Sequence, residues 1–193
     1  MKVPQFVHNV RKATLERSSR FSFSKLHYTQ NGTERFWEIM RSDRHRTGIL
    51  LYDTSTDNFV LTKKFRPALL TRECRLGPEG QSVPTARCHT TELFSCTAHA
   101  EAKLGPVLES VQEGLGVQLH ESDVSKVTSF TVWGEKYHLF YSEIREVSRP
   151  DPLSNIHMLP SDSIDDFLRL TEPMGSELCL ALQWWRWRKL NGG

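Results

Sequence analysis

Two glutamates lie four residues apart in a short segment whose apolar residues recur at helical spacing. If residues 106–115 form a helix, Glu109 and Glu113 place their carboxylates on one face, one turn apart. Carboxylate oxygens are the hard ligands that Mg²⁺ prefers, and Mg²⁺ neutralises phosphates and positions a water during pyrophosphate hydrolysis. The spacing is therefore that of a weak metal site suited to phosphate chemistry.

The helix that must position these carboxylates has a start and an end in the sequence. Gly105-Pro106 interrupts any element from upstream, and proline is tolerated in the first turn of a new helix. Gly114 and Gly116 are expected to end it. One apolar stripe follows from the positions of Val107, Leu108, Val111 and Leu115. We therefore expect a helix with one buried face.

Two β-hairpins are predicted upstream of this helix. In residues 21–42, aromatic and polar residues alternate on both sides of Asn31-Gly32, which is a two-residue turn signal. Residues 47–53 and 59–65 are apolar runs separated by turn-forming residues, so they predict a second hairpin.

The remaining elements follow from the same signals. Residues 66–91 contain three prolines and many charges, which predicts a long loop. Downstream we expect strands at 92–98, 124–132 and 137–144, an extended segment at 156–160, and helices at 161–170 and 176–189. The last helix carries Leu178, Leu182 and Trp185 on one face. This order predicts an α+β or mixed α/β sandwich, with an irregular leader at 1–20 and one domain at 21–190.

Composition limits the classes of function. The chain of 193 residues is 38% hydrophobic and 25% charged with a net charge of +2, which indicates a globular protein. So small a charge favours no nucleic-acid partner, and no apolar run is long enough to span a membrane. The four cysteines form no disulfide framework. A cytoplasmic location with reduced thiols is expected, although the basic N-terminus faintly resembles a mitochondrial presequence.

The helix and its approach resemble the signature of the Nudix hydrolase family, Gx5Ex7REUxEExGU, in which U is a bulky aliphatic residue. Laid without gaps, the signature matches Glu101, Val111, Glu113, Gly116 and Val117. It departs at Ser95, Glu109, Ser110 and Gly114. In the family, the positions taken here by Ser110 and Gly114 hold the principal glutamate ligands of the metal.

Segments on both sides of the signature strengthen the resemblance. Residues 26–40 and 49–69 are similar to the N-terminal hairpin and paired strands of the UDP-glucose and ADP-ribose pyrophosphatases, the branch that includes animal UDP-sugar diphosphatases. Residues 171–187 are similar to its closing helix. The resemblance implies a Nudix α/β/α sandwich with a mixed sheet. It also implies a cytoplasmic homodimer that uses Mg²⁺, with Mn²⁺ as a substitute, on a nucleotide sugar.

A second register would move the signature by one residue, so that Glu109 and Glu113 occupy both ligand positions. That register would turn Ser110 toward the core, and an unpartnered buried hydroxyl costs on the order of 1–3 kcal/mol. The ungapped register places Leu108 and Val111 there instead, so we favour it.

Several side chains are candidates for the site. Glu113 and Glu101 are the catalytic candidates, and Glu113 with Glu109 could bind the metal. Arg66, in the motif Lys64-Phe65-Arg66, is expected to contact a substrate phosphate or an acidic neighbour, whereas Lys63 and Lys64 are expected at the surface. Trp37 is a candidate for stacking on a base. Four residues could be considered as zinc ligands, but their spacing fits no standard pattern and favours ordinary loop residues: Cys88, His89, Cys96 and His99.

The sequence is compatible with two functions. The first is hydrolysis of UDP-glucose or ADP-ribose to a nucleoside monophosphate and a sugar phosphate, with weak activity. The second is an inactive Nudix-fold protein that binds a nucleotide or a partner, because Ser110 and Gly114 replace metal ligands. A third hypothesis is that residues 66–105 do not assemble the loop of the signature at all.

Overall fold

The structure, a computed structural model, describes residues 6–7, 21–30, 33–42, 44–66, 69, 83–84, 88–98, 104–132, 134–145, 147, 155–170 and 174–192. Its strands are β1 (Phe6–Val7), β2 (Ser22–Gln30), β3 (Thr33–Arg41), β4 (His45–Asp53), β5 (Asn58–Phe65), β6 (Val83–Pro84), β7 (His89–Glu92), β8 (Phe94–Ala98), β9 (Ser125–Val132), β10 (Glu135–Ile144) and β11 (Ile156–Pro160). Its helices are α2 (Gly105–Leu115), α3 (Ile164–Leu170) and α4 (Ser176–Leu190), with 3-10 turns η1 (Glu121–Asp123) and η2 (Ser161–Ser163).

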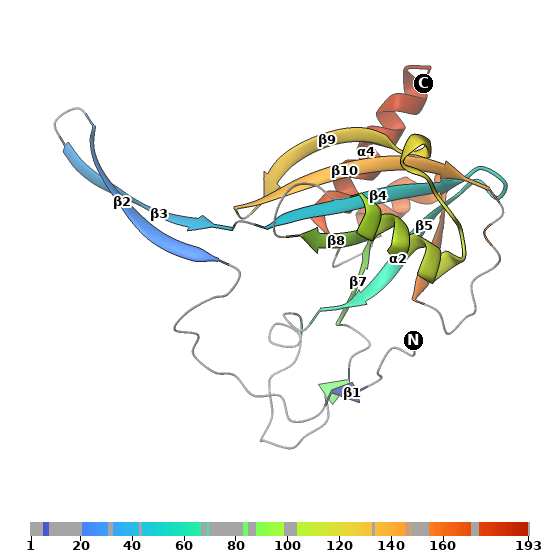
Figure 1. Cartoon of the computed structure of the whole chain (residues 1–193), viewed down its shortest axis with the longest axis horizontal. Helices are drawn as coiled ribbons and strands as arrows, with labels where there is room; N and C mark the ends of the chain where they lie inside the picture. The colour runs from blue at the N-terminus through green and yellow to red at the C-terminus, as the bar shows by residue number, and fades with distance from the viewer. Residues whose placement is uncertain are drawn as a thin grey trace.

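A mixed seven-stranded sheet forms the centre of the molecule, in the order β11-β5-β4-β10-β9 (Figure 1). β10 runs parallel to β4 and antiparallel to β9, and β4 and β5 form the second predicted hairpin. β7 pairs with β5, and β8 pairs with β4. Parallel and antiparallel pairs therefore share one sheet, which confirms the mixed topology.

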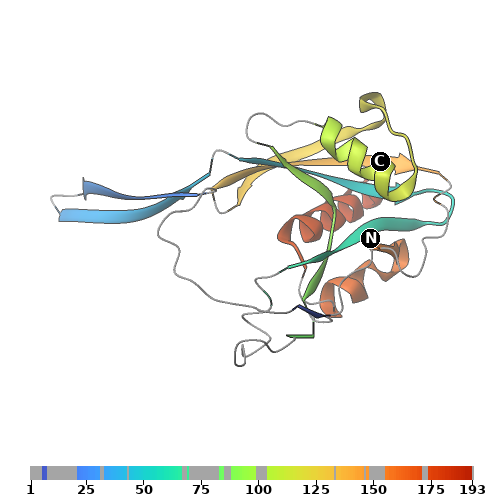
Figure 2. The same cartoon turned by 60° about the horizontal axis from the view of Figure 1, so that its bottom comes forward.

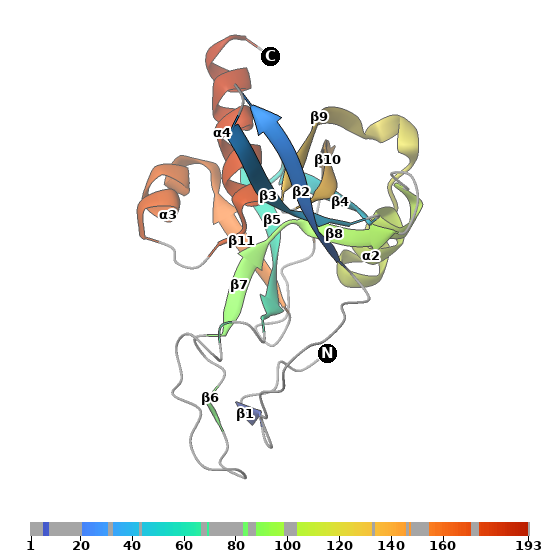
Figure 3. The ribbon, with the colours of Figure 1, turned by 90° about the vertical axis from the view of Figure 1, so that its left-hand side faces the viewer.

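Helices cover both faces of this sheet, α2 on one face and α3 with α4 on the other (Figures 2 and 3). On the α2 face, Val107 and Val111 are fully buried against Phe94 and its apolar neighbours. On the α4 face, Trp185 packs edge-on against Phe59, with ring centroids 4.9 Å apart. The apolar stripes predicted for both helices are confirmed, as is the α/β sandwich.

β4 and β5 pair only beside their shared turn and then diverge. Their ladder covers three residue pairs, which end at Leu51 and Val60. β7 and β8 lie in the gap between the diverging strands. β7 pairs with β5, and β8 pairs with β4. The strand predicted at 92–98 is therefore divided at Leu93. The loop predicted over 66–91 is wrong at its end, since His89 already starts β7 and pairs with Phe65.

The first hairpin, β2–β3, extends away from the central sheet as a two-stranded ribbon (Figure 1). Gln30 pairs with Thr33, which confirms the predicted two-residue connection. Phe23 is 71% exposed and Phe36 is 56% exposed, so large aromatic surfaces on this ribbon face solvent.

A short strand pair lies outside this sandwich. In the predicted leader, Phe6 and Val7 form β1, which pairs antiparallel with β6. No helix in the part of the chain that the structure describes has the length and apolar composition needed to cross a membrane.

Candidate active site

Helix α2 has the boundaries that its glycines and proline predict, with one difference. It begins at Gly105, and Pro106 lies in the first turn, where no intrahelical N–H donor is required. Gly116 adopts a φ of 69° and donates its N–H to the Gln112 oxygen at 2.8 Å, which ends the helix. Gly114 lies within the helix rather than ending it. The signature residues 109–114 therefore all share one regular helix.

The two acidic residues predicted to bind metal face solvent. Val107 and Val111 are buried, whereas Glu109 and Glu113 are exposed and lie on the opposite side of α2. The two carboxylates share one face, one turn apart, as their spacing predicts. Two such carboxylates fit Mg²⁺ in the mode in which it keeps several waters and takes its remaining ligands from substrate phosphates.

The positions of the lost family ligands lie on a different flank of α2. Ser110 is half-buried, and a Cβ built on Gly114 would lie 3.2 Å from the Cε1 of Phe94. Residues at these two positions thus turn toward β8 and the sheet, while Glu109 and Glu113 turn outward. A glutamate at position 114 would require Phe94 to move by a few tenths of an ångström.

An ion pair whose carboxylate is buried lies at the end of β5. Arg66 donates from Nε and Nη2 to the two carboxylate oxygens of Glu92 on β7. Glu92 is 3% exposed, and Thr90 donates its hydroxyl to the same carboxylate. The backbone N–H of Arg66 donates to the Cys88 oxygen at 2.7 Å. Arg66 thus makes the contact with an acidic neighbour that its sequence position predicts.

A second cation lies beside this ion pair. Lys64 donates from Nζ to the backbone oxygen of Ser95 at 3.2 Å and to its hydroxyl at 3.1 Å. The surface position predicted for Lys64 is wrong, because Lys64 is half-buried between β5 and β8, whereas Lys63 is exposed. Burial lowers the pKa of Lys64, although the nearby Glu92 carboxylate opposes this effect. We refer to Lys64, Arg66, Thr90, Glu92 and Ser95 as the Arg66 cluster.

β8 contacts both the Arg66 cluster and helix α2. Ser95 belongs to the cluster, while the neighbouring Phe94 packs against α2. Formally the cluster holds two cations and one carboxylate, so it carries a net positive charge. A positive cluster beside the strand that leads into the helix can neutralise the phosphates of a substrate bound there.

Two predicted site residues cannot be placed in this arrangement. Glu101 lies outside the described residues. Trp37 belongs to β3, but its side chain is outside the described part of the structure. Within the described ranges, no three histidine, cysteine, aspartate or glutamate side chains could together hold a metal ion. Cys88 is buried and Cys96 is half-buried, and neither forms a disulfide.

Sequence reasoning missed Glu92 and the role of Lys64. Lys64 follows the buried run 59–62 of β5, and Glu92 follows two threonines in β7. A charged residue beside such a run is a signal of a buried pair. The pattern of a single strand, however, does not identify the partner. Thr62 pairs with Glu92 and Thr90 with Lys64 only because β5 and β7 are neighbours in the sheet.

Comparison with curated proteins finds mammalian relatives that carry the same name. The bovine (Bos taurus) protein uridine diphosphate glucose pyrophosphatase NUDT14 is 31% identical over 150 residues, covering 66% of this chain and 66% of the relative. The mouse (Mus musculus) protein of the same name is 22% identical over 147 residues, with the same coverage. The chain thus spans about two thirds of the length of the curated relatives that it matches. No family model matches the chain.

Comparison with solved structures supports the fold. The crystal structure of an ADP compounds hydrolase superposes with a TM-score of 0.64 and 14% sequence identity. The match covers 93% of this chain and 92% of that chain. A structure of a T. brucei MERS1–RNA complex matches with a TM-score of 0.47 and 10% identity over 68% of this chain and 56% of that chain.

Proposed function

The chain belongs to the Nudix family, and from this premise we propose that it hydrolyses a nucleotide sugar. The substrate is UDP-glucose or ADP-ribose, and water is added across the pyrophosphate P–O–P bond. The products are a nucleoside monophosphate and a sugar phosphate. The names of its relatives support this class of substrate.

The observation that carries the proposal is the Arg66 cluster beside β8. It holds two cations near the strand that enters the signature helix, where they can neutralise the pyrophosphate. Arg66 retains 39% exposure of its side chain while Glu92 fixes its orientation, so its remaining N–H groups can reach a substrate. Lys64 is anchored on Ser95 and keeps one further N–H donor.

Mg²⁺ or Mn²⁺ is the proposed cofactor, held by Glu113 and Glu109. When bound, the metal would neutralise phosphate charge and position the water. Because Ser110 and Gly114 supply no carboxylate, the metal would be bound weakly, and hydrolysis would be slower than in relatives with an intact signature. Glu101 remains a proposed catalytic residue and Trp37 a proposed substrate contact.

The test is hydrolysis of UDP-glucose and ADP-ribose, with the nucleoside monophosphate product quantified directly by ion-exchange chromatography. We expect turnover that rises as Mg²⁺ is titrated to millimolar levels, and a loss on the order of a hundredfold in Glu113→Gln. Glu121→Gln is the matched control, because Glu121 is an exposed glutamate on η1 outside the site. Turnover that persists in EDTA and in Glu113→Gln would contradict the proposed metal site.

A second candidate function is that of a catalytically inactive protein that binds a nucleotide or a partner. Ser110 and Gly114 favour it, since they leave α2 without the family ligands. Gain of turnover in Ser110→Glu with Gly114→Glu would support loss of the ligands as the cause of weak hydrolysis, whereas no turnover in the folded, unmodified protein would favour the binding protein. Because Gly114→Glu displaces Phe94, Ser110→Glu alone is the variant with less effect on folding.

We also propose that the protein is a homodimer joined through the β2–β3 ribbon. Two isolated antiparallel strands are marginally stable in water, so a ribbon that pairs with no other strand of the described structure needs a further contact. The exposed rings of Phe23 and Phe36 supply apolar surface for it.

A further inference from the structure

A cavity of about 520 Å³ lies beyond the C-terminal end of α2, apart from the Arg66 cluster. The cavity lies where the pairing of β9 with β10 ends before β10 does. The last pair of their ladder joins Tyr141 to Ser125, while β10 continues to Ile144. Residues 117–119, which precede β9 and η1, line the opposite wall. The size lies within the range of about 300–1,000 Å³ that is typical of small-molecule sites.

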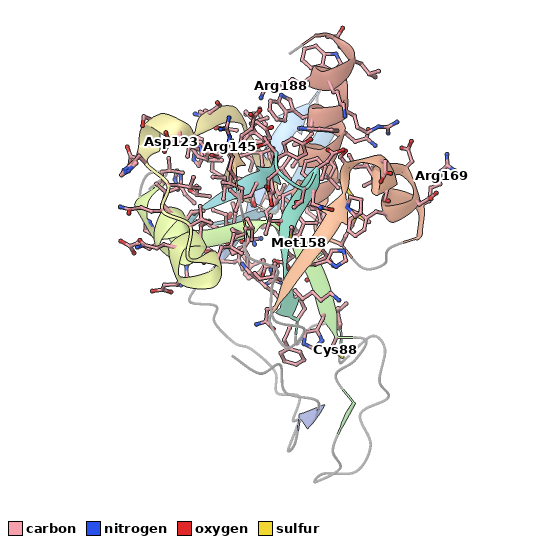
Figure 4. The ribbon with its side chains drawn as sticks, turned by 90° about the vertical axis from the view of Figure 1, so that its right-hand side faces the viewer. Cys88, Asp123, Arg145, Met158, Arg169 and Arg188 are labelled. Atoms are coloured by element: carbon pink, nitrogen blue, oxygen red, sulfur yellow. The ribbon has the colours of Figure 1, made fainter. Side chains whose placement is uncertain are left out.

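Two guanidinium groups from separate elements line this cavity. Arg145 follows β10, and Arg188 extends from α4 (Figure 4). Neither forms an ion pair with any residue that the structure describes. Arg188 lies over the rings of Tyr141 and Trp184, at 5.0 and 5.7 Å from their centroids, and these contacts fix its direction. Guanidinium groups that have no carboxylate partner can bind a phosphate through charge-assisted hydrogen bonds.

The cavity also contains acceptors, so a bare anion is not the ligand that fits it best. Glu143 accepts a hydrogen bond from Tyr141 at its Oε1, 3.1 Å away, and its second oxygen accepts none from the residues that the structure describes. Asp123 accepts the backbone N–H of His120 at its Oδ2 and the Ser122 hydroxyl at its Oδ1, which leaves each oxygen one further lone pair. The two carboxylates balance the two arginines in formal charge. A ligand that carries one phosphate and several hydroxyl donors satisfies both sets.

We propose that this cavity binds a phosphorylated sugar. Arg145 and Arg188 hold its phosphate, and Glu143 with Asp123 accepts hydrogen bonds from its hydroxyls. The site is separate from the proposed hydrolytic site, because none of its lining residues belongs to the Arg66 cluster or is Glu109 or Glu113. It requires neither metal nor turnover, so it stands or fails independently of the proposed function.

The test is calorimetric titration of glucose 1-phosphate into the full chain in EDTA. We expect binding to the unmodified protein and a weakening of about tenfold or more in Arg145→Gln, because a charge-assisted contact is lost. Arg145 is exposed and forms no ion pair with a described residue, so this variant should retain the unmodified melting temperature. Glucose without phosphate should not bind, and inorganic phosphate should bind more weakly than the sugar phosphate.

Arg186→Gln is the matched control. Arg186 lies on the same helix as Arg188 but pairs with Asp165 at 2.8 Å and does not line the cavity. Its binding should equal that of the unmodified protein. The proposal is overturned if the folded protein binds no glucose 1-phosphate at millimolar concentration, or if Arg145→Gln binds it unchanged. It is also overturned if Arg66→Gln abolishes binding while Arg145→Gln does not, since the ligand would then occupy the Arg66 cluster.

Discussion

At the scale of single residues, the ion pair of Arg66 and Glu92 is the best-defined feature of the candidate site. The carboxylate is almost fully buried, and its acceptor capacity is used by two guanidinium nitrogens and the Thr90 hydroxyl. Such a pair holds a cation in one orientation at the end of β5. The two partners differ in burial. Removal of Arg66 would leave a buried carboxylate without a cation, whereas removal of Glu92 would leave an arginine that is partly exposed to water.

This difference in burial predicts how substitution of each partner changes the free energy of unfolding. We expect Arg66→Met to lower the free energy of unfolding by about 2–3 kcal/mol, since it leaves a buried carboxylate without its cation. Glu92→Gln should cost less, because the amide is neutral and the arginine is partly solvated. Urea denaturation of both variants and of the double variant measures the coupling between them. If Arg66→Met stays within about 0.5 kcal/mol of the unmodified protein, the pair does not contribute as its burial implies.

At the scale of elements, α2 has one face that packs against the sheet and an opposite, exposed face that carries the proposed metal ligands. Val107 and Val111 join the core between α2 and the sheet, while Glu109 and Glu113 take no part in packing. Substitution on one side should therefore leave the other property unchanged.

We expect Val111→Ala to lower the free energy of unfolding by about 2 kcal/mol, because it removes buried methyl groups and leaves a cavity against Phe94 and its neighbours. Glu113→Ala is the matched control on the same helix. Since its side chain is exposed, a change of about 0.5 kcal/mol or less is expected. Thermal or urea unfolding of the two variants compares them. Equal losses would mean that the outer face of α2 is also packed, for example by a partner.

At the scale of the whole molecule, the β2–β3 ribbon is the part that the sandwich does not bury (Figure 2). Phe23 and Phe36 expose more than half of their surface, and Lys25 lies 3.7 Å from the centroid of the Phe36 ring. A second copy of the chain would cover this apolar surface.

We therefore expect the protein to be a dimer at micromolar concentration, and Phe23→Ser with Phe36→Ser to make it a monomer. Light scattering after size-exclusion chromatography measures the mass. Leu190→Ser is the control, because Leu190 is 84% exposed but lies at the end of α4. A monomeric unmodified protein, or a dimer that survives the double substitution, would contradict the proposed role of the ribbon.

The order and type of the elements could be predicted from the sequence because these depend on local patterns. Alternation around Asn31-Gly32 indicated the first hairpin, and the spacing of Val107 and Val111 indicated the buried face of α2. The same spacing was sufficient to place Glu109 and Glu113 together on the exposed side. Each of these inferences concerns residues within one element or across one turn.

The contacts between residues on different strands could be identified from the tertiary structure alone. Arg66 lies 26 residues from Glu92, and Lys64 lies 31 residues from Ser95. These contacts depend on β7 and β8 filling the gap where β4 and β5 diverge, and no periodicity along one strand encodes that arrangement. The polar cavity arises in the same way, because Arg145 and Arg188 come from elements that are neighbours only after the sheet has formed. The buried face of an element follows from the residue pattern of that segment alone. The partner of a buried charge depends on the order of the strands in the sheet.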